Sequence, residues 1–337
     1  MKLHIDKTDA ITDGPKFLRR VRSTFAALKP GDHTINVPIG NTRIQFRARI
    51  VAGSKKVLFT FHGAVNRETT RTTPFNSFFP ALTDTHQIAV SDPSLVVSRD
   101  FRVGWFAGHA GFDTQFHLRG ALRTIASALD VDRTIFFGSS AGGFAALYFS
   151  YFTPRSIAIV FNPQTSILNY HSQHISPYRN ACWPETTCNE DLMKVTCADV
   201  TKLYAQGFRN TVVYCQSMGD WHHASRHMLP FVAAIAGQTQ ARRLLLHSDY
   251  KGQEGHVSDY ESFRDWALAA SSSPSDDPRD LLNVWHVIRS RPSASAEATG
   301  MAIPASDAPG AAPVRRAFRA EDIETARRLR AFQEASR

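Results

Sequence analysis

The chain has 337 residues, of which 43% are hydrophobic, enough to bury a substantial core in one catalytic domain with additional elements. No stretch approaches the roughly 18 consecutive apolar residues that span a bilayer, and the N-terminus has no apolar signal-peptide core, so we expect a cytoplasmic protein without a membrane span. The net charge of +9 comes from arginines spread along the chain and not from a compact basic block, which argues against a nucleic acid partner.

The N-terminal part of the chain predicts a helix followed by a β-hairpin. Apolar side chains recur at helical spacing over residues 14–28, and Pro15 stands near the start, where a helix tolerates proline. Alternating apolar and polar residues follow at 33–38 and 42–51, separated by a Gly-Asn pair that is typical of a hairpin turn. We interpret these segments as an amphipathic helix and the antiparallel first strands of a sheet.

Continuous apolar runs, typical of strands buried on both faces of a parallel sheet, recur through the middle of the chain. They lie at residues 56–61, 87–91, 156–161, 211–215 and 243–247, with a further run that begins at residue 134. Helical patterns at 115–129 and 143–150 lie between them, and this alternation predicts an α/β fold with a mostly parallel, doubly wound sheet. The long polar segment at 162–207 is the expected cap insert over the site.

The composition changes after residue 270, which we take as the boundary of a catalytic domain at 1–270. A tail rich in Ser, Pro and Ala follows at 271–337, broken by an apolar patch at 281–288. A charged helix predicted at 319–335 carries a narrow apolar stripe. We expect this stripe to pack on the parent domain or on a second subunit, which would make the protein a homo-oligomer through its C-terminal helix.

Residues 134–144, T-I-F-F-G-S-S-A-G-G-F, predict a strand that turns sharply into a helix at a G-x-S-x-G motif. In such a nucleophile elbow the serine lies in a strained turn, so the residues two before and two after it must be very small. Around Ser140 both of these residues are glycines, whereas a motif centred on Ser139 would place Phe137 in the turn. Ser140 is therefore the predicted nucleophile; the competing interpretation is a Gly/Ser turn that opens an ordinary helix.

A serine nucleophile needs an imidazole base, and the base needs a carboxylate that orients it. Behind an elbow of this type the acid and then the histidine follow in chain order, each after a strand. Asp220 follows the strand at 211–215 in the sequence Q-S-M-G-D-W-H-H, and His256 lies in a glycine-flanked loop after the strand at 243–247. The predicted catalytic set is therefore Ser140, Asp220 and His256.

Other residues compete for the roles of base and acid. The alternative bases are His222, His223 and His247, and the alternative acids are Asp199, Asp249 and Glu254. The bases lie in the acid loop or at a strand end and lack the span to meet both partners. The acids lie in the insert or too near His256 in sequence. We expect His223 to support the site or to face the substrate, with a polar loop residue as the equally weighted interpretation.

Preorganised N–H groups are needed to bind the oxyanion that forms during acyl transfer. The expected donors are the backbone N–H groups of Ala141, which follows the nucleophile, and of Gly63 and Ala64 in the loop F-T-F-H-G-A-V-N-R. Further residues could contact the substrate, and each has a competing interpretation. They are His62 (a loop organiser), Arg67 (a solvated arginine), Trp105 (core packing) and His223 (a polar loop residue).

We expect neither a metal nor a cofactor. Zinc could in principle be bound by four residues, His171, His174, Cys182 and Cys188, but their spacing matches no common zinc motif. Neither G-x-G-x-x-G nor G-x-x-x-x-G-K-[ST] occurs, so nucleotide binding through these loops has no support. The four cysteines form no CxxC pair, which indicates reduced thiols.

Between about residues 57 and 257 the sequence resembles the α/β-hydrolase superfamily. The resemblance rests on H-G-A at the early loop, G-S-S-A-G-G at the elbow, the aspartate in G-D-W-H and the histidine in E-G-H-V. The segment F-G-S-S-A-G-G-F-A-A-L followed by N-P-Q-T also resembles bacterial serine hydrolases associated with surface-glycan assembly. The superfamily resemblance implies Ser140, Asp220 and His256 as the triad. The early loop reads H-G-A where many esterases have H-G-G, which weakens the transfer of that element.

From these features we expect a serine hydrolase that cleaves a small-molecule or glycan ester, with a preference for short acyl groups. Two alternatives stay open. The same triad could pass the acyl group to a sugar hydroxyl, which would make the protein an acyltransferase, or the fold could serve as a non-catalytic binding or assembly module.

Overall fold

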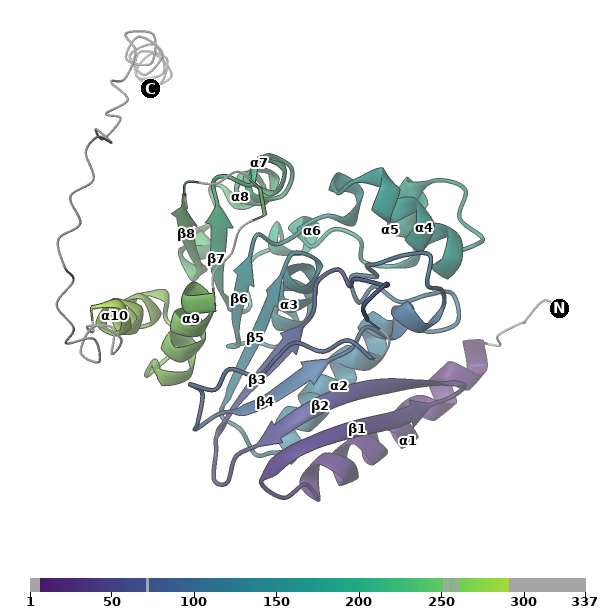
Figure 1. The fold of residues 1–337 in the computed structure, drawn as a ribbon, viewed down its shortest axis with the longest axis horizontal. Coiled ribbons are helices and arrows are strands. Elements are labelled where there is room, and N and C mark those ends of the chain that lie inside the picture. The colour runs from purple at the N-terminus through teal and green to yellow at the C-terminus, as the bar shows by residue number, and fades with distance from the viewer. Residues whose placement is uncertain (1–6, 71–72, 251, 253–254, 257–259, 291–337) are drawn as a thin grey trace, which may run out of the picture. The chain divides into compact units, whose positions relative to one another are not determined.

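The computed structural model describes residues 7–290 except 71–72, 251, 253–254 and 257–259, and Figure 1 shows it as a ribbon. Side chains are described from residue 14 onward. Everything described below belongs to one compact unit, Met1–Arg291.

One eight-stranded sheet forms the centre of this unit, in the order β1-β2-β4-β3-β5-β6-β7-β8 (Figure 1). The strands are β1 (Gly31–Ile39), β2 (Thr42–Ile50), β3 (Lys56–Phe61), β4 (His86–Val90), β5 (Arg133–Ser139), β6 (Ile157–Phe161), β7 (Thr211–Ser217) and β8 (Leu244–Asp249). β2 pairs antiparallel with both β1 and β4, whereas all other neighbours are parallel. The predicted fold class, a mostly parallel sheet with antiparallel N-terminal strands, is confirmed.

Helices cover both faces of the sheet (Figure 1). The longer ones are α1 (Lys7–Ala26), α2 (Thr114–Ala128), α3 (Ala141–Tyr151), α4 (Ser172–Cys182), α9 (Tyr260–Ser272) and α10 (Pro278–Arg289). The shorter ones are α5 (Leu192–Val195), α6 (Thr201–Tyr204), α7 (Trp221–His223) and α8 (Leu229–Ile235). Side chains of α1, α2 and α3 belong to one hydrophobic core, and those of α9 and α10 belong to a second core on the opposite face.

The central strand β5 shows why its sequence is continuously apolar. Phe136 packs into the core beneath α3, while its neighbours Ile135 and Phe137 pack into the core beneath α9 and α10. Successive side chains of a strand point to opposite faces, so a strand covered on both faces needs an apolar residue at every position. This pattern agrees with the position of β5 between β3 and β6, in the middle of the sheet, and the carboxyl end of β5 leads into the candidate site.

The compact unit extends beyond residue 270, where the sequence suggested a boundary. Leu281 on α10 is fully buried and packs in the same core as Trp266 on α9. The apolar patch seen in the sequence at 281–288 is thus the buried face of a helix that covers the sheet. The helix expected at 319–335 lies outside the described residues.

The segment between β6 and β7 contains α4, α5 and α6, where the sequence predicted a cap insert.

The part of the chain that the structure describes contains no helix that is both long and apolar enough to cross a membrane.

Candidate active site

Ser140 occupies a strained turn between β5 and α3. Its backbone has φ 54° and ψ −122°, a conformation that costs a non-glycine residue about 1–3 kcal/mol. A Cβ atom on Gly138 would lie 2.1 Å from the carbonyl oxygen of Gly142, and a Cβ atom on Gly142 would lie 2.1 Å from the carbonyl oxygen of Phe61. Only glycine fits at these two positions, as the elbow motif requires.

β5, β6, β7 and β8 are parallel neighbours in the sheet (Figure 1), and a polar residue of this region lies in the chain after the carboxyl end of each. Ser140 follows β5, Gln164 follows β6, Asp220 follows β7 and His256 follows β8. Neighbouring strands lie about 4.8 Å apart, so residues that directly follow adjacent strands can come within hydrogen-bonding distance. The lateral order of the strands therefore brings residues from distant parts of the sequence together.

Asp220 binds two imidazoles. Its Oδ2 accepts a hydrogen bond of 2.6 Å from Nδ1 of His256, and its Oδ1 accepts one of 3.0 Å from Nδ1 of His223. A carboxylate can only accept, so Nδ1 carries a proton in both rings. Burial alone would raise the pKa of Asp220, but the hydrogen bonds from His223 and His256 outweigh burial and hold this pKa far below its usual range. Asp220 is therefore an ionised group that orients both rings.

Gln164 contacts the hydroxyl of the elbow serine. Its Nε2 donates a hydrogen bond of 2.9 Å to Oγ of Ser140 and lies 3.5 Å from Nε2 of His223. Its Oε1 accepts a hydrogen bond from the indole N–H of Trp105. Because an indole nitrogen can only donate, this contact fixes which end of the amide faces Ser140. From the sequence, Trp105 could either contact the substrate or pack in the core, and Gln164 was not selected, although N-P-Q-T directly after a buried strand was a usable signal.

The predicted acid Asp220 and the predicted base His256 are in direct contact, whereas the predicted nucleophile Ser140 is connected to them through other side chains. A chain of contacts runs from Ser140 through Gln164 and His223 to Asp220 and His256. Among the described residues, the Ser140 hydroxyl is hydrogen-bonded to Gln164 and not to His256. The His256 side chain is 41% exposed, against 6% for His223, so His256 is the imidazole with room to move.

Two of the expected oxyanion donors, Ala141 and Gly63, lie beside Ser140. Ala141 is the first residue of α3, so its N–H group has no acceptor within the helix. A Cβ atom on Gly63 would lie 3.4 Å from the carbonyl oxygen of Ser139 and 3.7 Å from Cβ of Ser140, which places this loop directly beside the elbow. The N–H group of Val65, past Ala64, is already bonded to a carbonyl of another loop.

His62 and Arg67 organise loops around the site. Nδ1 of His62 donates to the carbonyl of Gly63 at 2.8 Å, and its Nε2 accepts from the backbone N–H of Asp92 at 3.1 Å. Burial lowers the pKa of His62, so the ring stays neutral in this arrangement. The guanidinium of Arg67 donates to three backbone carbonyls, those of Leu95, Ser98 and Phe101.

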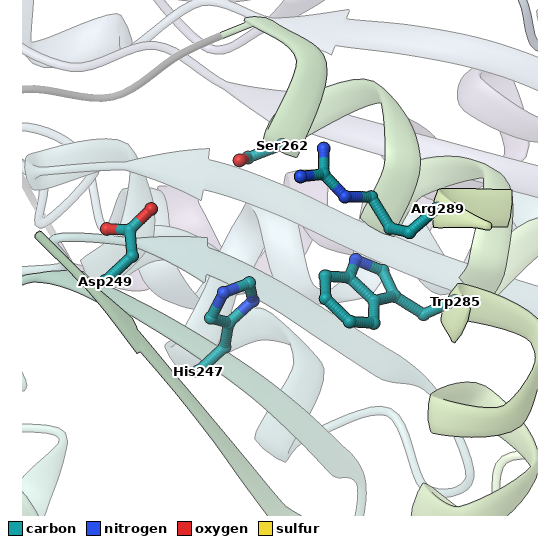
Figure 2. A pocket seen from close by; sticks show the side chains of 5 residues that line it. All are labelled: His247, Asp249, Ser262, Trp285 and Arg289. Carbon is teal, nitrogen blue, oxygen red and sulfur yellow. The ribbon is translucent and has the colours of Figure 1, made fainter. Parts of the chain in front are cut away.

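The alternative base His247 and alternative acid Asp249 line a separate pocket. Figure 2 shows Ser262, Trp285 and Arg289, which come from α9 and α10, around these two residues of β8. Nδ1 of His247 accepts a hydrogen bond of 2.9 Å from the indole N–H of Trp266. This pocket shares no lining residue with the set that surrounds Ser140.

Imidazoles cluster between the cap and the acid loop. Tyr170 lies within 6.3 Å, between ring centroids, of five of them, namely His171, His174, His222, His223 and His227. His171 of the cap stacks on His222 of α7 with centroids 3.9 Å apart. The cap is thus attached to the loop that carries Asp220.

The group of side chains best arranged to hold a metal is not the set drawn from the sequence. Among the described residues, Asp220, His223 and His256 place three ligand atoms within 4.8 Å of one another. Cys182 and Cys188 of the earlier set are free thiols, the first buried and the second exposed.

The sequence matches no protein-family model and no curated protein. Solved structures are similar in fold. The capsule O-acetyltransferase of Neisseria meningitidis serogroup A is 14% identical, with a TM-score of 0.51 over 79% of this chain and 99% of that one. A mutant of it in complex with CoA is 15% identical, with a TM-score of 0.50 over 71% and 95%. Dipeptidyl peptidase 4 of Porphyromonas gingivalis is 13% identical, with a TM-score of 0.50 over 78% and 37%. The chain has the α/β-hydrolase fold.

Proposed function

We propose that the protein is a serine hydrolase that cleaves an ester through an acyl-enzyme formed on Ser140. One observation carries the proposal: the strained elbow presents Ser140 beside the ends of the strands that deliver an ionised Asp220 hydrogen-bonded to His256. Backbone strain of about 1–3 kcal/mol and a buried carboxylate that orients an exposed imidazole both lower stability, and such features cluster at sites with a chemical function.

In the proposed reaction His256 acts through Nε2, because its Nδ1 proton is held by Asp220. Nε2 takes the proton of the Ser140 hydroxyl as Oγ attacks the carbonyl carbon of the ester. The N–H groups of Ala141 and Gly63 bind the resulting oxyanion, and Asp220 stabilises the imidazolium. The imidazolium then protonates the leaving alkoxide. Water attacks the acyl-enzyme in the second half, with His256 again as the base.

Gln164 prepares the nucleophile in this scheme. Its amide donates to a lone pair of the Ser140 oxygen, so the hydroxyl proton stays free to point toward the base. His256 reaches it by a movement of its exposed side chain while Nδ1 keeps its contact with Asp220. Gln164 is therefore a positioning residue, and Trp105 holds it in place.

Transfer of the acyl group to a sugar hydroxyl is the second candidate function. The observation that favours it is the similarity to the capsule O-acetyltransferase, which extends over 99% of that chain. Transfer and hydrolysis share the acyl-enzyme and differ only in which hydroxyl attacks it. A site that admits a sugar and excludes water would transfer.

Covalent labelling tests the proposal. A fluorophosphonate probe should label the wild-type protein at Ser140, and Ser140→Ala should abolish the label. Ser139→Ala is the matched control, because it removes the neighbouring hydroxyl and leaves the proposed nucleophile. Well-folded wild-type protein that takes up no probe would point instead to the binding or assembly module.

A partition experiment separates the two enzymatic candidates. The protein is incubated with p-nitrophenyl acetate or acetyl-CoA, with and without an unmodified polysaccharide, and both free acetate and acetylated sugar are measured. Release of acetate at a rate that the polysaccharide does not change supports the hydrolase. Acetylated sugar that replaces free acetate supports the transferase. p-Nitrophenyl esters of longer chains, run in parallel, test the expected short-acyl preference.

A further inference from the structure

Asp220 is hydrogen-bonded to two imidazoles, whereas the acid of a catalytic triad needs to orient only one base. His223 lies three residues after Asp220 on the same loop and helix α7, and His256 approaches from the loop after β8, so the carboxylate is held from two sides. One ligand atom from each of the three side chains lies within 4.8 Å of the other two. We propose that Asp220, His223 and His256 form a binding site for one Zn²⁺ ion and that this ion switches off the serine chemistry. The second half of this inference rests on the function proposed above.

The donor set fits zinc. Two imidazole nitrogens and one carboxylate oxygen are ligands of open zinc sites, in which water fills the fourth position. Bonds of about 2.0–2.1 Å in a tetrahedral site place the ligand atoms about 3.3 Å apart. From Oδ2 of Asp220 the present separations are 2.6 Å to Nδ1 of His256 and 2.9 Å to Nδ1 of His223, so both contacts need only lengthen slightly. Mixed nitrogen and oxygen donors bind Zn²⁺ more tightly than Fe²⁺ or Mn²⁺ and Cu²⁺ more tightly still, so the assignment to Zn²⁺ rests on the ligand types and on an open four-coordinate geometry.

Charge and access fit a cation as well. Asp220 supplies a negative charge with only 6% of its side chain exposed, and it faces imidazoles instead of a lysine or arginine. The exposed His256 side chain marks the route by which an ion reaches the buried carboxylate.

The positions of the imidazole protons explain why bound zinc would inhibit the reaction of Ser140. Coordination through Nδ1 needs the lone pair of that nitrogen, so the proton now on Nδ1 of each neutral ring moves to Nε2. Nε2 then becomes a donor without a lone pair. His256 can no longer accept the proton of Ser140, and His223 can no longer accept from the amide of Gln164. No redox step and no net proton release are required.

Calorimetric titration of the full chain with Zn²⁺ alone tests the site. We perform it in the Ser140→Ala background, which cannot react, and expect one ion per chain. His223→Phe and His256→Gln should each weaken binding at least tenfold. Both are used because His223 is buried and its variant could misfold, whereas His256 is exposed. His222→Phe is the matched control: it removes the adjacent imidazole, which stacks on His171 outside the trio, and it should bind as the parent does.

Two results would overturn the site: no saturable zinc binding, or binding that His222→Phe weakens and the His223 and His256 variants leave unchanged. A second arm measures the rate of fluorophosphonate labelling of wild-type protein with saturating Zn²⁺ and with a chelator. Labelling that zinc slows at least tenfold supports the switch, and labelling that zinc leaves unchanged refutes it. If Ser140 is never labelled, the proposed function and the switch both fall, while the titration still decides the metal site.

Discussion

Gln164 offers the sharpest test of how the site is held together. Its side chain is fully buried and contacts three groups, the hydroxyl of Ser140, the indole N–H of Trp105 and, at 3.5 Å, Nε2 of His223. Gln164→Leu keeps the side chain close in size and removes these polar contacts. The backbone N–H of residue 164, which donates to the carbonyl of Ser140 at 3.0 Å, is retained.

The expected loss of stability follows from what is left behind. Trp105 is 1% exposed, so its N–H group has no access to water, and an unpaired buried donor costs about 1–3 kcal/mol. Loss of the bond to Ser140 adds about 0.5–1.5 kcal/mol. At about 2–4 °C per kcal/mol for a chain of this size, Gln164→Leu should lower Tm by roughly 3–18 °C. Gln206→Leu, which changes an exposed glutamine, should shift Tm little.

A double-mutant cycle checks this reasoning by thermal unfolding. Trp105→Phe removes the donor, so Gln164→Leu should cost at least about 1 kcal/mol less in that background than alone. Fluorophosphonate labelling should slow in Gln164→Leu even where the protein is folded. An unchanged Tm for Gln164→Leu, or strict additivity of the two substitutions, would show that the amide does not bridge these groups.

Two further predictions concern stability. Gly142→Ala should destabilise the unit by about 1–3 kcal/mol and abolish labelling, because a Cβ atom there would lie 2.1 Å from the carbonyl oxygen of Phe61. The control in thermal unfolding is Gly14→Ala, whose Cβ atom meets nothing within 4 Å. Its free energy of unfolding should stay within about 1 kcal/mol of wild type. Stability in urea should fall as pH drops below about 6.5, because burial lowers the pKa of His62 and the unfolded chain binds a proton that the folded chain refuses, by at most about 1.4 kcal/mol per pH unit for this residue. His62→Asn should reduce that slope without abolishing it, because burial also lowers the pKa of other histidines such as His117 and His227, and an equal slope in both proteins would contradict the assignment.

Much of the architecture could be read from the sequence. Runs that are apolar at every position predicted the central strands, and the structure has β3 at the residues predicted, 56–61. The two glycines around Ser140 identified the elbow, because only they allow the backbone contacts found there. These features are local: burial on both faces and the size limit of a tight turn act directly on residues next to one another.

The sequence also predicted that Asp220 and His256 belong together, since chain order and position after a strand suffice for that. It did not predict that His223 shares the same carboxylate, that Gln164 stands between Ser140 and His223, or that α10 completes the unit beyond residue 270.

Local sequence determined which segments became strands, where the elbow formed and which loops carried an acid and a histidine. Tertiary structure alone decided which side chains share a proton or a lone pair. The physical reason is range: burial and turn sterics are set by neighbours along the chain, whereas a hydrogen bond forms only within about 3.5 Å. The lateral order of β5 to β8 and the direction of each side chain determine which groups come that close.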